Sequence, residues 1–281
     1  MKWQDGREGQ VEDRRGLTAG HYAGGGIAVV IIALIGYVFF HIDPQQILGA
    51  ASQGQQQVMA GDQTSLSQPQ DEQGKFAATI YASADDTWSA IFAKQGKAYH
   101  KPKMVLYSGG TGTACGEGQS AMGPFYCPDD ESIYLDVDFF NTLDQQLGAP
   151  GDFAKSYVIA HEFGHHIQKL LGVSDAVSRR EQGASESAAN ALSVKLELQA
   201  DCYAGVWARQ SNARMNWIEA GDIDEALNAA AAVGDDTLQK ETQGMVVPDS
   251  FTHGTSAQRQ HWFRAGYDSG LPTSCDTFGA G

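Results

Sequence analysis

The chain has 281 residues, of which 42% are hydrophobic, and it carries a formal net charge of −15 at pH 7. This length and composition allow one sizeable domain with additional segments. The acidity argues against the basic face that nucleic-acid binding requires, so we expect no nucleic-acid partner. An acidic surface is otherwise typical of soluble domains and does not identify a substrate.

An uncharged apolar segment near the N-terminus, GGGIAVVIIALIGYVFF, covers residues 24–40. With its neighbours it approaches the ~20 residues that span a bilayer core. Four Lys or Arg residues precede it, and none follows until Lys75. The positive-inside rule therefore predicts a single-pass membrane protein with a cytoplasmic N-terminus and an exported remainder. A cleaved signal peptide and a buried core helix remain as alternatives.

The sequence between the apolar segment and residue 75 is rich in Gln, Ser, Gly and Ala and has little periodic hydrophobicity. This composition is typical of a flexible tether. We therefore divide the chain into a cytoplasmic tail (1–23), a transmembrane anchor (24–41), a flexible linker (42–74) and an exported domain (75–281).

The exported domain begins with apolar residues at helical spacing over 76–95. A short apolar run over 103–107 predicts a strand, and the glycine-rich stretch 108–123 predicts a loop. That loop lacks the lysine of a P-loop, which argues against phosphate binding. Alternating apolar and polar residues within 132–140 predict a second strand. A strand just upstream of a peptidase's metal-binding helix often forms the edge that binds substrate.

Further helices are expected toward the C-terminus from apolar periodicity and from capping residues. They run from Asp152 to Gly172, from about Ser185 to Gln210, from a capping box formed by Asp222 and Glu225, and from Thr255 or Ser256 to about Gly266. The domain is thus expected to be mainly helical with a small sheet, which is an α+β fold.

All four cysteines lie on the side predicted to be exported. An even number of cysteines in an oxidising compartment suggests two disulfides, for which three pairings exist. We favour Cys115–Cys127 as a local loop staple and Cys202–Cys275 as a clamp between a helix and the C-terminus. Free buried thiols remain the alternative.

The most informative motif is His161-Glu162-Phe163-Gly164-His165, the HExxH pattern. Positions i and i+4 of a helix lie on one face, so His161 and His165 can bind the same Zn²⁺ with Glu162 beside the open position. Two satisfied polar histidines on a helix face are the alternative. A catalytic zinc needs three protein ligands, so the motif is incomplete alone.

The downstream segment Glu197-Leu198-Gln199-Ala200-Asp201 supplies the missing carboxylate. We expect Glu197 to be the third ligand, with Glu186 or Glu181 as fallbacks. Asp201, one helical turn further on, is suited to accept the outer N–H of one histidine ligand and to fix its tautomer.

Zn²⁺ held by three such ligands lowers the pKa of its water from ~15.7 towards ~7. Glu162 is then expected to take the proton of the attacking water and pass it to the leaving amine. A second cluster runs from Thr252 through His253 and Gly254 to Arg259. His253 and Arg259 are candidate donors to the oxyanion that forms during the reaction, although both could instead be ordinary surface residues.

These motifs resemble the bacterial "putative neutral zinc metallopeptidase" family, whose members are membrane-anchored with an exported peptidase-like domain. The matching segments occur in order along almost the whole chain. They are residues 2–7, the apolar segment, 113–116, 123–128, 133–136, 161–168, 197–207 and 253–259.

The resemblance implies a zincin-like fold and one zinc per chain. HExxH followed by Glu-x-x-x-Asp is more distantly similar to the gluzincin pattern. The His253–Arg259 cluster is similar to that of CAAX-type membrane metallopeptidases, except that Gly254 stands where those have proline.

The sequence therefore predicts a zinc endopeptidase that acts on peptide or protein substrates at the bacterial inner membrane, in the periplasm or outside the cell. Two other functions are compatible with the same residues. One is a zinc-dependent amidase of cell-wall material, and the other is a non-catalytic binding module stabilised by zinc.

Overall fold

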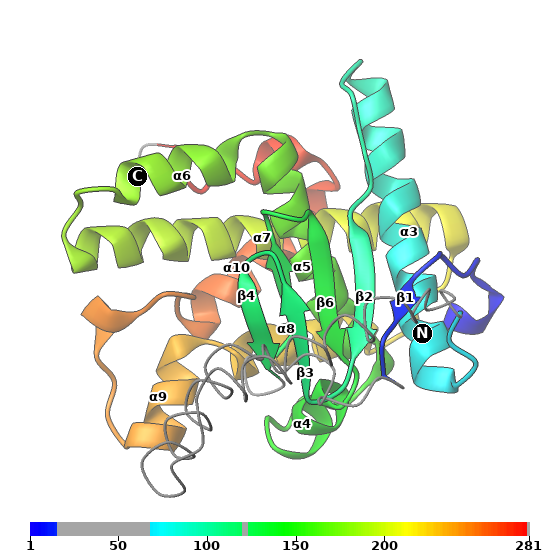
Figure 1. The fold of residues 1–281 in the computed structure, drawn as a ribbon, viewed down its shortest axis with the longest axis horizontal. Coiled ribbons are helices and arrows are strands. Elements are labelled where there is room, and N and C mark those ends of the chain that lie inside the picture. Colours follow the sequence, from blue (N-terminus) through cyan, green and yellow to red (C-terminus); the bar gives the residue numbers. More distant parts are fainter. Residues whose placement is uncertain (16–67, 120–122, 280–281) are drawn as a thin grey trace, which may run out of the picture. The chain divides into compact units, whose positions relative to one another are not determined.

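The computed structural model describes residues 1–15, 68–119 and 123–279 (Figure 1). Met1–Arg14 belong to the same compact unit as the chain that follows Gln68. The expected anchor (24–41) lies outside the described residues, as does the expected linker up to residue 67. Within the described part of the chain, no helix is both long enough and apolar enough to cross a membrane.

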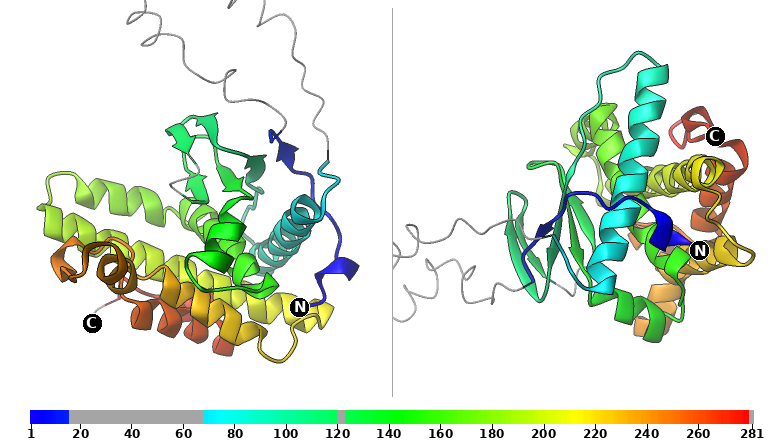
Figure 2. Two further views of the ribbon diagram at one scale, coloured as in Figure 1. Left: turned by 90° about the horizontal axis from the view of Figure 1, so that it is seen from below. Right: turned by 90° about the vertical axis from the view of Figure 1, so that its right-hand side faces the viewer.

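The described part is mainly helical with a small sheet, which confirms the α+β expectation (Figures 1 and 2). The helices are α3 Glu72–Lys94, α4 Phe139–Gln145, α5 Asp152–Leu170, α6 Val173–Glu181, α7 Glu186–Met215, α8 Asp222–Ala232, α9 Asp235–Gln243 and α10 Ser256–Ser269, with short 3-10 turns η1 Trp3–Asp5, η4 Pro248–Ser250 and η5 Pro272–Ser274. The strands are β1 Glu12–Asp13, β2 Lys103–Tyr107, β3 Gly110–Thr113, β4 Gly116–Gln119, β5 Phe125–Cys127 and β6 Ser132–Asp136.

The main sheet has the strand order β1-β2-β6-β5. Strands β1, β2 and β6 are parallel, and β5 runs antiparallel to β6. Alternate residues of β2 and β6 pack into two different apolar clusters, one on each face of the sheet. The sheet is therefore covered on both sides, which is why every residue of β6 is buried.

The glycine-rich stretch 108–123 was predicted to be a loop, and the structure instead folds part of it into a hairpin of β3 and β4. A Cβ on Gly118 would lie 2.6 Å from the Phe125 ring, so glycine lets the hairpin approach β5 closely. Hydrophobic periodicity cannot predict this contact between segments. The contact depends on a position that has no side chain, and such a position adds nothing to a hydrophobic pattern.

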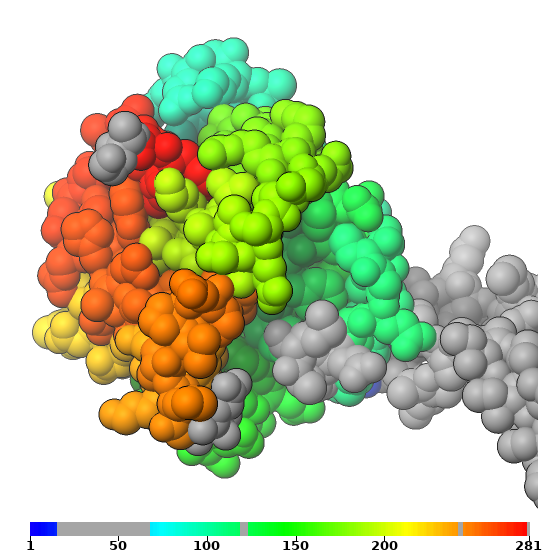
Figure 3. Space-filling model, turned by 90° about the vertical axis from the view of Figure 1, so that its left-hand side faces the viewer, coloured from blue at the N-terminus to red at the C-terminus, as the bar shows by residue number. Residues whose placement is uncertain are grey.

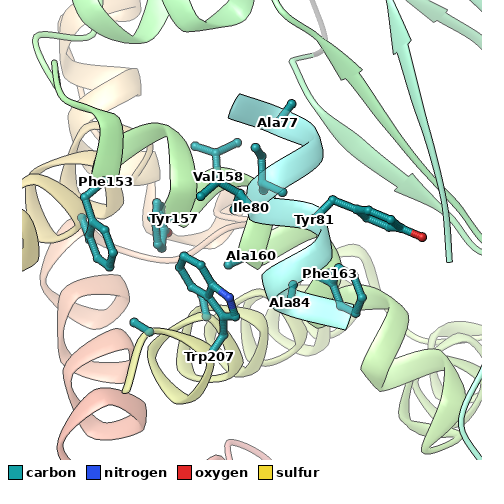
Figure 4. Close-up of a cluster of buried hydrophobic side chains, with 14 of the residues drawn as sticks. Ala77, Ile80, Tyr81, Ala84, Phe153, Tyr157, Val158, Ala160, Phe163 and Trp207 are labelled. Carbon is teal, nitrogen blue, oxygen red and sulfur yellow. The ribbon is translucent and has the colours of Figure 1, made fainter. Parts of the chain in front are cut away.

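The core lies between helices α3, α5 and α7, whose apolar side chains interdigitate (Figure 4). Trp207 of α7 stacks against Phe153 of α5 at a ring distance of 5.9 Å. Tyr81 of α3 meets Phe163 of α5 at 6.0 Å. These contacts hold α5, which carries the HExxH motif, between two long helices.

Both predicted disulfides are present, Cys115–Cys127 and Cys202–Cys275. The first ties the β3–β4 hairpin to β5, and the second ties α7 to the C-terminal turn η5. The pairing confirms the sequence-based choice among the three possibilities.

The predicted capping box at the start of α8 does not form, since Gly221 is the N-cap and no side chain caps the helix. Glu225 instead accepts a hydrogen bond from the backbone N–H of Phe153, at 3.0 Å, in the first turn of α5. The carboxylate therefore satisfies a free N–H of a different helix. Asp152, expected to be the N-cap of α5, is its first residue.

The first fourteen residues, expected to be part of a separate tail, pack against the rest of the unit. Trp3 and Val11 are buried in the main core. The backbone N–H of Gly9 donates to the carbonyl oxygen of Ala78 in α3 at 2.9 Å. Strand β1 adds to the sheet beside β2, where Glu12 pairs with Val105.

The crossing of α7 and α10 yields a stability prediction. A Cβ on Gly266 of α10 would collide with the backbone carbonyl of Cys202 in α7. We expect Gly266→Ala to destabilise the protein by about 1–3 kcal/mol, because the two backbones must separate. Thermal unfolding measures this, with Asp268→Ala on the exposed face of α10 as the control. Equal melting temperatures for both variants would contradict the close packing.

Candidate metal centre and active site

Helix α5 presents His161 and His165 one turn apart, and α7 brings Glu197 against them. The two histidine Nε2 atoms are 3.2 Å apart. Glu197 places Oε2 3.1 Å from Nε2 of His161 and Oε1 3.3 Å from Nε2 of His165. Ligands bonded to tetrahedral zinc at ~2.0 Å are separated by about 3.3 Å. With one ligand atom taken from each residue, the three side chains lie within 4.8 Å of one another, which is close enough to hold one metal ion.

The outer nitrogens of both histidines are held in place. Nδ1 of His161 lies 2.8 Å from Oδ1 of Asp201, the partner predicted from the sequence. Nδ1 of His165 lies 2.9 Å from Oε1 of Gln168, whose amide donates to the carbonyl oxygen of Leu196 at 2.6 Å. Such partners leave Nε2 of each ring as the nitrogen available to a metal.

Asp201 is completely buried and joins three helices. On its own helix, α7, it follows Glu197 by one turn. It accepts hydrogen bonds from the Tyr157 hydroxyl of α5 and from two atoms of Arg259 of α10, Nε at 2.8 Å and Nη2 at 2.9 Å. The bidentate guanidinium contact fixes both carboxylate oxygens.

Arg259, a candidate oxyanion donor in the sequence, lines the same pocket, although only 3% of the residue is exposed. Its guanidinium is held on Asp201. Nη2 also lies 3.9 Å from Oε2 of Glu197. Arg259 therefore contacts the residue that orients His161, and its role at the oxyanion stays a prediction.

The acidic and basic groups at the candidate metal site stabilise one another's charged forms. Burial alone would raise the pKa of Asp201, but Arg259 and His161 hold it below its usual value. Burial would likewise raise the pKa of Glu197, and the two histidines lower it well below its ordinary range. Both carboxylates are therefore ionised, which is the form that binds a cation and orients a histidine ligand.

Glu162 lies in the wall of the pocket with 8% of its surface exposed. Burial raises the pKa of its carboxyl group, and the nearby histidines partly counteract this effect. Since a general base works best when its pKa approaches the working pH, a raised pKa suits proton transfer.

A pocket of about 840 Å³ opens in front of the cluster, and His161, Glu162, His165 and Glu197 all line it. In Figure 3 this face is hollowed between the yellow-green α6 and α7 and the green strands. Most of the remaining lining is apolar. It comes from β5 and α4 on one side and from α6, α7 and α9 on the other, with Phe125, Phe139, Val177, Leu196 and Leu238 among the residues.

His253 also lines the pocket, and its side chain is half exposed. Nδ1 lies 3.2 Å from Oδ1 of Asp235. Oδ2 of Asp235 accepts hydrogen bonds from the backbone N–H groups of Thr252, His253 and Gly254, at 2.6 to 2.9 Å. Asp235 therefore fixes the whole turn that carries His253, and Nε2 is left as the ring nitrogen that can meet a ligand.

Gly164, the fourth residue of the HExxH motif, lies where α5 and α7 approach each other. A Cβ there would lie 3.0 Å from the carbonyl oxygen of Ala200. The glycine lets α5 approach the backbone of α7, and this approach brings Glu197 to the histidines.

His166 does not belong to the group of candidate metal ligands formed by His161, His165 and Glu197. Nε2 of His166 is hydrogen-bonded to the carbonyl oxygen of His100 at 2.8 Å, and its Nδ1 lies 3.1 Å from the Tyr126 hydroxyl. Burial lowers its pKa. It joins α5 to β5. Of the fallback ligands, Glu181 lines the pocket, and neither Glu181 nor Glu186 belongs to this group of candidate ligands.

Sequence analysis gave no role to Tyr157, Gln168 or Asp235. Tyr157 precedes His161 by four residues and Gln168 follows His165 by three, so both lie on the metal face of α5. That spacing was an available signal for supporting roles. Asp235 had no comparable signal, because it lies 18 residues before its partner His253.

Comparisons with known proteins identify the family of the chain. A family model described as "Putative neutral zinc metallopeptidase" matches residues 1–278. The uncharacterized protein YpfJ of Escherichia coli (strain K12) is 48% identical over 291 aligned residues, which cover 99% of each chain. The uncharacterized protein Mb2605 of Mycobacterium bovis is 48% identical over 208 residues, covering 70% of this chain and 68% of that one. No solved structure matches.

The donor geometry predicts the stoichiometry of metal binding. The purified full chain should hold one zinc, and His161→Ala or His165→Ala should abolish stoichiometric binding, because two protein ligands are too few. Elemental analysis after dialysis measures this. His253→Ala is the control and should keep its zinc. Undiminished zinc in both ligand variants would place the metal elsewhere.

The contacts of Arg259 predict that this residue affects zinc affinity, although it is not one of the three candidate ligands. Arg259→Lys removes the bidentate hold on Asp201, and we expect zinc affinity to fall about 10–100-fold. Competition with a chromogenic chelator gives the affinity, and a melting curve checks that the fold persists. Arg264→Lys, on the exposed side of α10, is the matched control. Equal affinities for the two variants would remove Arg259 from the positioning role.

Proposed function

Because this chain belongs to the family described as "Putative neutral zinc metallopeptidase", we propose that it is a zinc-dependent endopeptidase. The observation that carries the proposal is the convergence of His161, His165 and Glu197, whose candidate ligand atoms lie within 4.8 Å of one another, on the wall of a pocket that also holds Glu162. A purely structural zinc site would have a fourth protein ligand and no need of an adjacent acid.

His161, His165 and Glu197 would hold the metal. When bound, zinc lowers the pKa of water and polarises a carbonyl group. Glu162, buried at the same wall, accepts the proton of the attacking water and later donates it to the leaving amine. Asp201 and Gln168 keep the two imidazoles oriented throughout.

His253 is the candidate donor to the oxygen that gains negative charge. Its Nδ1 is held by Asp235, so Nε2 can face a carbonyl group bound in the pocket. Arg259 acts on the reaction through Asp201, which holds its guanidinium. Arg259 also lines the pocket and stays the second candidate donor that the sequence suggested.

The pocket favours an extended peptide with an apolar side chain. Strand β5 ends the described sheet next to the pocket, and Phe125 and Tyr126 of β5 line it. An extended peptide can add to such an edge through its backbone. This edge is β5, whereas the sequence suggested the strand that became β6. The apolar walls then accept a side chain on either side of the scissile bond.

We place the peptidase on the exported side of the bacterial inner membrane. Two disulfides in one domain are typical of an oxidising compartment. The apolar segment 24–41 would attach the protein to the membrane.

The role of Glu162 is tested by separating metal binding from turnover. Glu162→Gln should keep its zinc but lower cleavage of a quenched fluorescent peptide library by roughly 10²-fold or more, because the water loses its proton acceptor. Glu197→Gln should instead weaken zinc binding, since an amide is the poorer ligand. Glu181→Gln, another pocket carboxylate, is the control and should leave cleavage nearly unchanged.

The assay also decides between enzyme classes. A chelator should abolish cleavage by the full chain, and added zinc should restore it. Release of fragments from peptidoglycan without any peptide cleavage would replace the endopeptidase by an amidase. Full cleavage by Glu162→Gln would refute the proposed base.

A further inference from the structure

The contacts of the N-terminal arm, defined as Met1–Arg14, bear on how the chain meets the membrane. We propose that the N-terminal arm and the body of the protein, residues 68–279, fold together in one compartment, so that the apolar segment 24–41 does not pass through the membrane between them. The proposal is independent of the peptidase chemistry.

The arm is built into the core of the body. Trp3 is 8% exposed, and its ring meets Phe76 of α3 edge-on at 5.3 Å. Its indole N–H donates to Oδ2 of Asp152, at 3.1 Å, at the start of α5. Val11 is 4% exposed. Burial of such a large side chain contributes strongly to the stability of the folded state.

The backbone of the arm is paired at both ends and in the middle. The N–H of Lys2 donates to the carbonyl oxygen of Trp217 at 2.8 Å, and the N–H of Arg14 donates to that of Leu106 at 2.7 Å. Between them Gly9 bonds to α3. The parallel pairing of β1 with β2 covers the edge of the sheet, which would otherwise present unpaired backbone groups. Figure 2 shows the arm in blue along α3 in both views.

Two glycines permit this fit. A Cβ on Gly6 would collide with the side chain of Thr79, and a Cβ on Gly9 would lie 2.6 Å from the ring of Tyr81. The arm and α3 are therefore complementary in shape, and a chance contact between a tail and a surface would not need either glycine.

The basic residues of the arm also have partners in the fold. Lys2 pairs with Glu219 at 3.5 Å and Arg7 with Asp86 at 2.6 Å, whereas Arg14 pairs with Glu12 within the arm at 2.7 Å. The cytoplasmic orientation of the N-terminus rested on these charges. These contacts are compatible with an arm that lies in the same compartment as the body.

The length of the apolar segment limits how many times the chain can cross the membrane. One crossing needs ~20 apolar residues, so the apolar segment is long enough for one passage and too short for two. The sequence from residue 42 to residue 67 is too polar to supply the second. A single passage would put the arm and the body on opposite sides, where none of their contacts could form. With the body exported, the arm is exported too.

Topology is tested with the full chain in cells whose outer membrane has been removed, using a membrane-impermeant maleimide. Lys2→Cys and Lys94→Cys each add one exposed thiol, and the four native cysteines are already paired. We expect both variants to be labelled equally before lysis. Labelling of Lys94→Cys before lysis but of Lys2→Cys only after lysis would overturn the proposal. Labelling of both only after lysis would keep it and instead refute the exported location.

Docking is tested on the purified full chain. Arg7→Cys combined with Asp86→Cys, two exposed positions whose native side chains lie 2.6 Å apart, should be joined by a short bifunctional maleimide, seen as a linked pair of peptides. The control combines Arg7→Cys with Lys94→Cys, which lies eight residues and about 12 Å further along α3. Equal cross-linking of both pairs, or of neither, would show that the arm is not docked at α3.

Discussion

The active-site cluster depends on the buried contact between Asp201 and Arg259. A carboxylate that is fully removed from water is costly unless it is paired and its oxygens are satisfied. Here Arg259, Tyr157 and His161 satisfy both oxygens, and they come from two helices other than the one that carries Asp201. The same contact therefore fixes the packing of α5, α7 and α10 and the orientation of a metal ligand.

The close approach of α7 to its neighbours follows from small residues at the crossings. Gly164 admits the backbone of α7 beside α5, whereas Gly205 and Gly266 admit α10. The disulfide between Cys202 and Cys275 then ties the middle of α7 to the C-terminus. Glu197 and Asp201 lie on this restrained stretch, so the geometry of the donors is set before any metal arrives, and little conformational entropy remains to be lost on binding.

The N-terminal arm carries a local topology signal and also makes tertiary contacts that this signal does not describe. Four basic residues before an apolar segment are the usual sign of a cytoplasmic tail. Packing gives three of them partners within the folded unit and buries Trp3 and Val11 in the same core as α3. A hydropathy profile considers each segment separately and contains no information about contacts between segments. The free energy gained by burying the arm depends entirely on those contacts.

The sequence by itself determined the features that rest on short spacing. The i and i+4 positions of His161 and His165 place them on one helical face, and Glu197 with Asp201 repeats this one-turn spacing on α7. The two disulfide pairings that we favoured are also present. Helices α3, α5, α7, α8 and α10 were expected from local pattern, whereas α4, α6 and α9 were not. Only the tertiary structure decided where Arg259 points, that Glu225 caps α5, and that the arm joins the body. Those outcomes depend on which distant segments pack together, and side-chain spacing within one element carries no information about its neighbours.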